Sequence, residues 1–121
     1  MKSWNVDAGI EFDKVNFTTF KLFNLTTQMI HLDIIVKGKV QGVFFRASTK
    51  AVADQLGIKG FVKNEENGDV AIAAEGDKMS MEMFLDWCKE GPENAEVTSV
   101  ESHEGELKNY RNFEIVKKRL F

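Results

Sequence analysis

Apolar side chains recur at every second position along much of the chain from residue 31 onward, and this period predicts strands. In the first such segment, Leu32, Ile34 and Val36 occupy every second position and so lie on one face, which predicts a half-buried strand. Further along, Asn67-Gly68 is typical of a hairpin turn, because both residue types tolerate a positive φ angle. The pattern as a whole predicts strands at residues 31–38, 58–63, 70–74, 97–102 and 113–116.

Two segments between these strands place apolar side chains at helical spacing. The first runs from about Arg46 to Leu56, where Gly57 is a natural stop because glycine adopts the left-handed conformation without strain. We expect its inner face to consist of Ala51, Val52, Gln55 and Leu56. The second helix follows Gly76-Asp77 and ends before Pro92, and its apolar stripe consists of Met83, Phe84, Trp87 and Cys88.

The order of these elements is β-α-β-β-α-β with one further strand at the end. It predicts an α+β fold, a ferredoxin-like split βαβ sandwich with two helices on one face of a mostly antiparallel, four- to five-stranded sheet. The first two strands should be parallel and, if they are neighbours, their ends should meet. We assign residues 31–121 to this domain. Residues 1–30 follow neither period, so we expect an N-terminal extension that is disordered or not part of the native domain.

Composition fits one compact domain and narrows the range of partners. With 43% hydrophobic residues among 121, the chain is long enough to bury a single core. Its formal net charge of -3 gives little attraction for nucleic acid or for an anionic membrane, so we expect neither as a partner. Any anionic ligand must therefore be held by a local site. A monomer is the default for a domain of this size.

Cysteine content and the absence of long apolar runs favour a cytoplasmic protein. Cys88 is the only cysteine, so the chain cannot form an intramolecular disulfide or a CxxC metal site. No apolar run approaches the roughly 20 residues that span a bilayer, and acidic residues interrupt the segment where a signal peptide would be apolar. We expect Cys88 itself to be an inert part of the core.

Motifs for several common chemistries are absent. The sequence contains no P-loop pattern, no GxGxxG, no GxSxG and no HExxH. His31 and His103 are the only histidines, too few to build a typical zinc site, and we expect both on the surfaces of strands. The sequence thus predicts neither a metal nor another cofactor.

The segment Gly38–Arg46 joins the first strand to the first helix and carries the candidate chemistry. Backbone N–H groups at a helix N-terminus have no intrahelical partner, and the helix dipole favours an anion there. Gly38 and Gly42 let the loop curl so that successive amides converge on phosphate oxygens, and Arg46 adds a planar, permanent charge. The loop is therefore a candidate phosphate cradle. The alternative is an ordinary surface loop with a solvated arginine.

The second candidate is Asn64, which ends the second predicted strand. A neutral amide both donates and accepts hydrogen bonds, so it can orient a water molecule without titrating. If the first two strands are neighbours, Asn64 lies close to the loop that carries Arg46. The alternative for Asn64 is a plain strand-end or turn residue.

These two segments resemble the acylphosphatase family. The nonapeptide Gly38–Arg46 is similar to the family signature glycine-x-valine-glutamine-glycine-valine-x-phenylalanine-arginine, with every fixed position matched. The segment Gly60–Val70 is similar to a second block of the family and retains Asn64. The resemblance covers roughly residues 31–118. One departure is Asn67, a turn position where the family often has aspartate.

The resemblance implies hydrolysis of acyl phosphates, the anhydrides of a carboxylic and a phosphoric acid, to a carboxylate and inorganic phosphate. Asn64 would hold the attacking water in line with the leaving carboxylate, and Thr49 would support Arg46 from one helical turn away. The family needs no metal. The phosphoryl oxygens would be bound by Arg46 and by the backbone amides of Val40, Gln41, Gly42, Val43, Phe44 and Phe45.

Two other functions fit the same order of elements. One is a non-catalytic anion-binding or interaction domain that has the cradle but does not turn over a substrate. The other is an RNA-recognition domain, a class that stacks bases on aromatic side chains of the sheet, especially of its third strand. Residues 70–74 contain no aromatic side chain, and the chain is acidic, which speaks against RNA.

Overall fold

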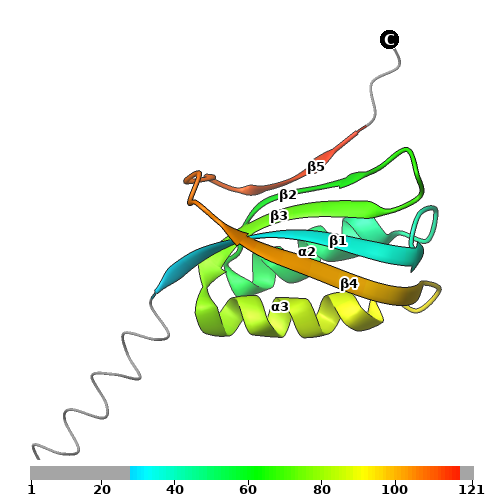
Figure 1. Cartoon of the computed structure of the whole chain (residues 1–121), viewed down its shortest axis with the longest axis horizontal. Coiled ribbons are helices and arrows are strands. Elements are labelled where there is room, and N and C mark those ends of the chain that lie inside the picture. The colour runs from blue at the N-terminus through cyan, green and yellow to red at the C-terminus, as the bar shows by residue number, and fades with distance from the viewer. Residues whose placement is uncertain (1–27, 118–121) are drawn as a thin grey trace, which may run out of the picture.

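The computed structural model describes residues 28–117 and consists of a five-stranded sheet with two helices on one face (Figure 1). The predicted α+β fold is confirmed. The first strand begins at Met29, two residues before the expected domain boundary, and the expected N-terminal extension lies outside the described residues as far as residue 27. The elements are β1 (Met29–Lys39), α2 (Phe45–Leu56), β2 (Lys59–Asn64), β3 (Val70–Asp77), α3 (Lys78–Glu90), β4 (Glu96–Gly105) and β5 (Phe113–Val116).

The strands lie in the order β4-β1-β3-β2-β5, and only the β2–β5 pair is parallel. Both β1 and β2 pair with β3 in antiparallel fashion, so they run in the same direction, as expected. They are not neighbours, however, because β3 lies between them. The ends of β1 and β2 therefore reach the same edge of the sheet with one strand separating them.

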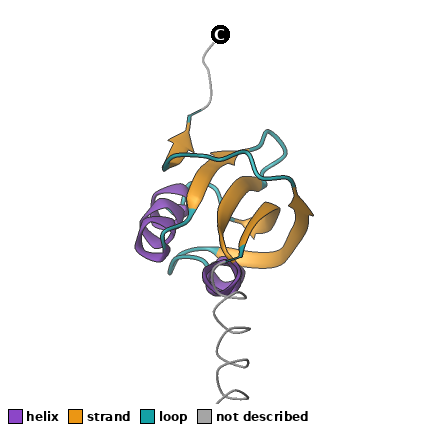
Figure 2. Cartoon of the chain, turned by 90° about the vertical axis from the view of Figure 1, so that its left-hand side faces the viewer, coloured by secondary structure: helices purple, strands orange, loops and turns teal. Residues whose placement is uncertain are grey.

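The core lies between the sheet and the two helices, which share one face of the sheet (Figure 2). Helix α3 packs against β1, β3 and β4, whereas α2 packs against β2 and β5. Aromatic rings join the two halves: Phe84 of α3 lies edge-on to Phe113 of β5, with ring centroids 6.2 Å apart. Burial of side chains of this size stabilises the fold by roughly 1.5–3 kcal/mol each. Other core residues include Ile34, Val36, Ile58, Val62, Val70 and Ile72.

Helix α2 is rotated relative to the expected orientation. Its buried residues are Phe45, Thr49 and Ala53, whereas Ala51 and Gln55 of the predicted inner face are exposed. The rotation follows from Phe45, whose ring is buried against Trp87 with centroids 5.4 Å apart. That large aromatic anchor determines which residues one and two turns later face the core.

Helix α3 begins with a side-chain cap, and its set of buried residues differs in part from the expected one. The Asp77 carboxylate accepts a hydrogen bond from the Ser80 backbone N–H at 2.9 Å, which is typical of a helix N-cap. Met83 of the expected stripe is exposed, while Met81 is buried. Cys88 is buried as expected, and burial raises the pKa of its thiol to about 12. Neither helix of the described part of the chain is long and apolar enough to cross a membrane.

His31 is buried, not exposed as expected, because the connection between β4 and β5 covers it. This connection, residues 106–112, runs between strands at opposite edges of the sheet and crosses the face that carries no helices. Its Tyr110 ring stacks on the His31 ring at 6.2 Å and lies edge-on to Phe61 at 5.9 Å. His103 lies on an exposed part of β4, as predicted.

Glu75 of β3 fastens the same connection to the sheet. Its carboxylate accepts hydrogen bonds from the backbone N–H groups of Lys108, Asn109 and Tyr110, and from His31 Nδ1 at 2.8 Å. Burial disfavours the ionised carboxylate, but these donors outweigh burial and hold the pKa of Glu75 below its usual value.

The imidazole of His31 lies between two carboxylates. Its Nε2 is 3.0 Å from Asp33 Oδ1, so both ring nitrogens can donate only when the ring is protonated. Burial lowers the pKa of His31, but the hydrogen bonds and charges of Glu75 and Asp33 outweigh it, so the pKa is raised. We refer to His31, Glu75 and residues 106–112 as the Glu75 anchor.

Candidate active site

The loop between β1 and α2 has the backbone geometry of an anion-binding nest. Gly42 and Phe44 have positive φ angles of 75° and 62°, while Val43 between them does not. Alternation of left- and right-handed residues turns successive N–H groups toward one point, which suits an anion. The loop leads directly into α2, whose first amides have no intrahelical partner. The geometry thus fits the predicted phosphate cradle.

Gly38 has a different role from the one expected. Its φ angle is 126°, and a Cβ atom there would lie 2.1 Å from the Glu96 carbonyl oxygen of β4. Gly38 is therefore required for the close approach of β1 and β4, near a shift in their register. Gly42 has open space around it, so its positive φ angle alone favours glycine.

The predicted binding residues of the loop can contribute through their backbone more than through their side chains. The side chains of Val40 and Phe45 are each 1% exposed and belong to the core. Phe44 is the exception, since its side chain is 79% exposed. A phosphate in the loop would consequently meet a ring of backbone amides.

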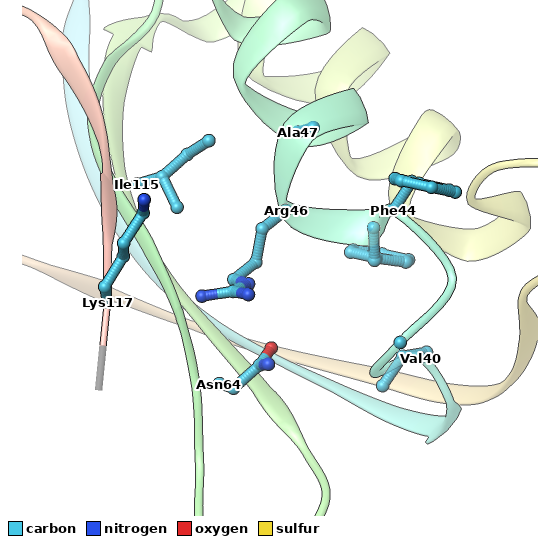
Figure 3. Close-up of a pocket in the computed structure, with 9 residues that line it drawn as sticks. Val40, Phe44, Arg46, Ala47, Asn64, Ile115 and Lys117 are labelled. Carbon is cyan, nitrogen blue, oxygen red and sulfur yellow. The ribbon is translucent and has the colours of Figure 1, made fainter. Parts of the chain in front are cut away.

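Arg46 lies in the first turn of α2, and its guanidinium points from the helix toward Asn64 (Figure 3). Among residues 28–117, the Arg46 side chain has neither an ion-pair partner nor a hydrogen bond to another side chain. Its planar fork is therefore available to two oxygens of an anion.

Asn64 ends β2 on the face of the sheet that carries the helices. Side chains alternate along a strand, so Asn64 points to the same side as the buried Val62. Its Oδ1 atom is buried and has no hydrogen-bond partner in the part of the chain that the structure describes. A buried acceptor without a donor is unfavourable by roughly 1–3 kcal/mol, and this atom could accept a hydrogen bond from a ligand or a water.

Gln41 connects the two halves of the site, a role that the sequence did not reveal. Its Nε2 donates hydrogen bonds to the backbone oxygens of Glu65 and Asp69, each at 2.8 Å. Both acceptors belong to the β2–β3 hairpin that carries Asn64. The side chain thereby bridges the gap that β3 leaves between the ends of β1 and β2, and it fixes Asn64 relative to the cradle.

A cavity of about 340 Å³ contains both predicted catalytic residues, and a second cavity of about 500 Å³ adjoins it. Arg46, Asn64 and Lys117 line both. Lys117 and Ile115 come from the end of β5, and sequence reasoning missed them because the parallel β2–β5 pairing brings them there. The first cavity is otherwise mostly apolar, with Val40, Gly42, Phe44, Phe45, Ala47 and Ile115 in its wall.

Thr49 is buried beneath the first turn of α2. Its hydroxyl donates to the Phe45 carbonyl oxygen at 2.7 Å. Any support that it gives to Arg46 acts through the helix backbone, because its hydrogen bond goes to the residue before the arginine.

The described residues contain no group of three or more histidine, cysteine, aspartate or glutamate side chains that could hold a metal ion. The acidic side chains closest to the site, Glu65 and Glu66, line only the second of the two cavities. The groups that the site offers to a ligand are backbone amides, a guanidinium and ammonium groups, which would suit an anion.

A family model described as acylphosphatase matches residues 32–115, which include the cradle, Arg46 and Asn64. The chain belongs to the acylphosphatase family. The family and the hydrolase class predicted from the two motifs are thereby confirmed.

Individual acylphosphatases agree with this assignment. The chain is 48% identical over 87 residues to an acylphosphatase of Archaeoglobus fulgidus, covering 72% of this chain and 98% of the relative. It is 50% identical over 86 residues to one of Dehalococcoides mccartyi, covering 69% and 94%. The solved structure of an acylphosphatase from Coxiella burnetii matches with a TM-score of 0.71 at 38% identity, over 73% of this chain and 93% of that one.

Proposed function

We propose that the chain hydrolyses small-molecule acyl phosphates to a carboxylate and inorganic phosphate at the site formed by the cradle, Arg46 and Asn64. One observation supports this most directly. The guanidinium of Arg46 and the buried Oδ1 of Asn64, both without a partner among residues 28–117, line the same cavity beside a nest of backbone amides. The first two groups suit an anion and a water, the two reactants of a phosphate-ester or anhydride hydrolysis.

In this proposal, the phosphoryl group binds first to the cradle. Amides of residues 40–45 donate to its oxygens, and Arg46 contributes two parallel N–H donors. These donors do not move as charge develops on the equatorial oxygens, so they stabilise the transition state without reorganisation. Gln41 contributes indirectly by fixing the loop to the hairpin of Asn64.

Asn64 orients the water. Its Oδ1 accepts one O–H of the water, which leaves a lone pair of the water oxygen directed at phosphorus. The new bond forms from this oxygen to phosphorus as the bond from phosphorus to the acyl oxygen breaks. The carboxylate leaves with that electron pair, and the water's protons go to the phosphate product and to solvent.

A carboxylate is a stable leaving group, so the reaction needs no strong general acid. Positioning of the reactants and stabilisation of phosphoryl charge supply most of the acceleration. We propose that the reaction proceeds without a metal ion. Activity that is unchanged by EDTA would support this part of the proposal.

The test measures the rate at which the purified protein hydrolyses benzoyl phosphate in the presence of EDTA. We expect rapid loss with the wild type and a decrease of about 10³-fold or more in kcat/KM for Arg46→Ala, since the guanidinium both anchors the phosphate and stabilises its transition state. Arg111→Ala is the matched control, because Arg111 is exposed and lies outside both cavities. Its kcat/KM should stay within about twofold of the wild type.

Failure of the wild type to hydrolyse benzoyl phosphate would contradict the proposal. Titration of the same folded sample with inorganic phosphate would then show whether the alternative applies, namely a non-catalytic anion-binding domain. Hydrolysis that is equally fast in Arg46→Ala would instead contradict the role of the arginine.

We also propose that the protein acts as a cytoplasmic monomer without a nucleic acid or membrane partner. The buried, unpaired Cys88 and the net charge of -3 support this. Light scattering coupled to size-exclusion chromatography tests the monomer, because a dimer would elute with twice the 13.7 kDa mass of the chain.

A further inference from the structure

We propose that the side chain of Phe44 is a specificity determinant that contacts the acyl group of the substrate and favours aromatic and other apolar acyl phosphates. This inference rests on the proposed hydrolysis at the Arg46–Asn64 site. Phe44 is the most exposed of the large hydrophobic side chains in the described chain, at 79%, and it lines the cavity that holds Arg46 and Asn64.

Neither packing nor backbone geometry explains a phenylalanine at this position. The side chain lies outside the core, so its ring adds little to the stability of the fold. Its φ angle of 62° is a left-handed conformation that a bulky residue adopts with strain and glycine adopts freely. Glycine would therefore serve the cradle better if only the backbone mattered. The ring therefore needs another explanation, and contact with a ligand in the neighbouring cavity would supply it.

The direction of the reaction places the acyl group on the side of Phe44. In a displacement at phosphorus, the attacking and leaving oxygens are roughly in line on opposite sides of the phosphorus atom. Asn64, which holds the water in the proposed function, lies at one end of the cavity. Figure 3 shows Phe44 on the far side of the cavity, beside the start of α2, and Asn64 below the Arg46 guanidinium. A phosphoryl group on Arg46 would thus direct its acyl substituent away from Asn64 and toward the ring.

The wall of the cavity supports an apolar acyl group there. Val40, Ala47 and Ile115 line the same cavity as Phe44 and offer no charge. An aromatic acyl group could lie against the exposed ring of Phe44 and remove both apolar surfaces from water.

The competing direction leads into the second cavity, which is charged. Lys63, Lys117, Glu65 and Glu66 line it, so it would suit an acyl group that carries a further anionic group. Lys117 lines both cavities and is the residue whose replacement would reveal this alternative.

The experiment compares kcat/KM for benzoyl phosphate with kcat/KM for acetyl phosphate, because their ratio reports acyl selectivity independently of damage to phosphate binding. We expect Phe44→Gly to lower the ratio about tenfold and Phe44→Leu to lower it less, since leucine keeps an apolar surface without a ring. Inhibition by inorganic phosphate, measured on each variant, reports the cradle separately.

Two control variants test whether the change in the ratio is specific to Phe44. Met79→Ala removes an exposed apolar side chain of α3 that lies outside both cavities, and it should leave the ratio unchanged. Lys117→Met should also leave the ratio within about twofold, because Lys117 lies on the opposite side of Arg46 from Phe44 (Figure 3).

The proposal is overturned if Phe44→Gly lowers kcat/KM equally for benzoyl phosphate and acetyl phosphate. Phe44 would then only shape the cradle. The proposal is also overturned if Lys117→Met, and not Phe44→Gly, changes the ratio. A wild type that hydrolyses neither substrate would contradict the proposed function itself. A wild type that hydrolyses both, with an unchanged ratio in Phe44→Gly, would contradict only this inference.

Discussion

The two ends of the sheet both hold polar groups next to the core, but only one end leaves them without partners. At the cradle end, Asn64 Oδ1 is buried without a donor, and Arg46 has no ionic partner among the described residues. At the opposite end, the Glu75 carboxylate accepts hydrogen bonds from three backbone N–H groups and from His31. The first end thus has groups that could bind a ligand, as the proposed function requires, whereas the polar groups at the second end bind one another.

This difference shows that burial and a shifted pKa do not identify a catalytic site by themselves. The Glu75 anchor contains a buried acid and a buried histidine with shifted pKa values, the features often sought in an active site. Its groups satisfy one another, and the polar backbone of residues 106–112 needs such partners because it crosses the sheet. What distinguishes the cradle end is hydrogen-bonding capacity that the protein does not use.

Asn64→Ala should separate activity from stability most strongly. We expect kcat for benzoyl phosphate to fall about 100-fold with KM little changed, because the water is used only in the chemical step. The free energy of unfolding in urea should be unchanged or higher, since the substitution removes a buried acceptor that lacks a donor. Asn67→Ala, in the exposed turn of the same hairpin, should keep its kcat. An intact kcat in Asn64→Ala would show that its amide does not orient the water.

Glu75→Gln should have the opposite effect, with a loss of stability and little change in activity. The amide would present N–H groups to backbone N–H donors, so we expect a loss of about 1–3 kcal/mol in the free energy of unfolding. The kcat should stay within about twofold of the wild type, because Glu75 lies outside both cavities. Glu101→Gln, an exposed position on β4, is the control for loss of charge. A kcat as low as that of Asn64→Ala would mean that the anchor controls the site through β5.

The pH dependence of stability should be smaller and should arise at the Glu75 anchor. The pKa of His31 is raised above 6.5, so its contribution is complete below that value and is lost as pH rises through the folded-state pKa. The pKa of Glu75 is lowered below 4.5, so its contribution is complete above 4.5 and is lost as pH falls through the folded-state pKa. Urea midpoints should therefore be highest between these limits and decrease on both sides.

The two histidines provide the check on that profile. His31→Gln should abolish the decrease on the alkaline side, whereas His103→Gln, at an exposed position on β4, should retain it. A profile that loses its alkaline decrease in His103→Gln would locate the titration away from the anchor.

Sequence patterns predicted the elements of the fold well because each depends on local chemistry. The alternation around Ile34, the Asn67-Gly68 turn and the glycine after α2 all act within a few residues. The loop before α2 was predictable for the same reason, since the loop and the first helical turn are contiguous, whereas its role as a phosphate cradle stays a prediction.

The features that sequence reasoning missed depend on pairing between distant segments. His31 looked exposed because its strand alternates, but the covering segment lies over 70 residues later in the chain. The insertion of β3 between β1 and β2, and the parallel β2–β5 pair that delivers Lys117, are likewise long-range choices. The sequence assigned the backbone amide of Gln41 to phosphate binding, but it gave no sign of the side chain's hydrogen bonds to the hairpin, because that partner becomes visible only with the sheet order known.

The buried thiol of Cys88 also makes the protein its own reporter of motion. Burial raises the pKa of this thiol to about 12, so almost all of it is protonated at pH 7, and the core encloses it. An alkylating reagent that targets thiols should therefore react with Cys88 mainly when the core around α3 opens. The labelling rate of this single cysteine would measure how often the native fold opens, without any substitution to introduce a reactive residue.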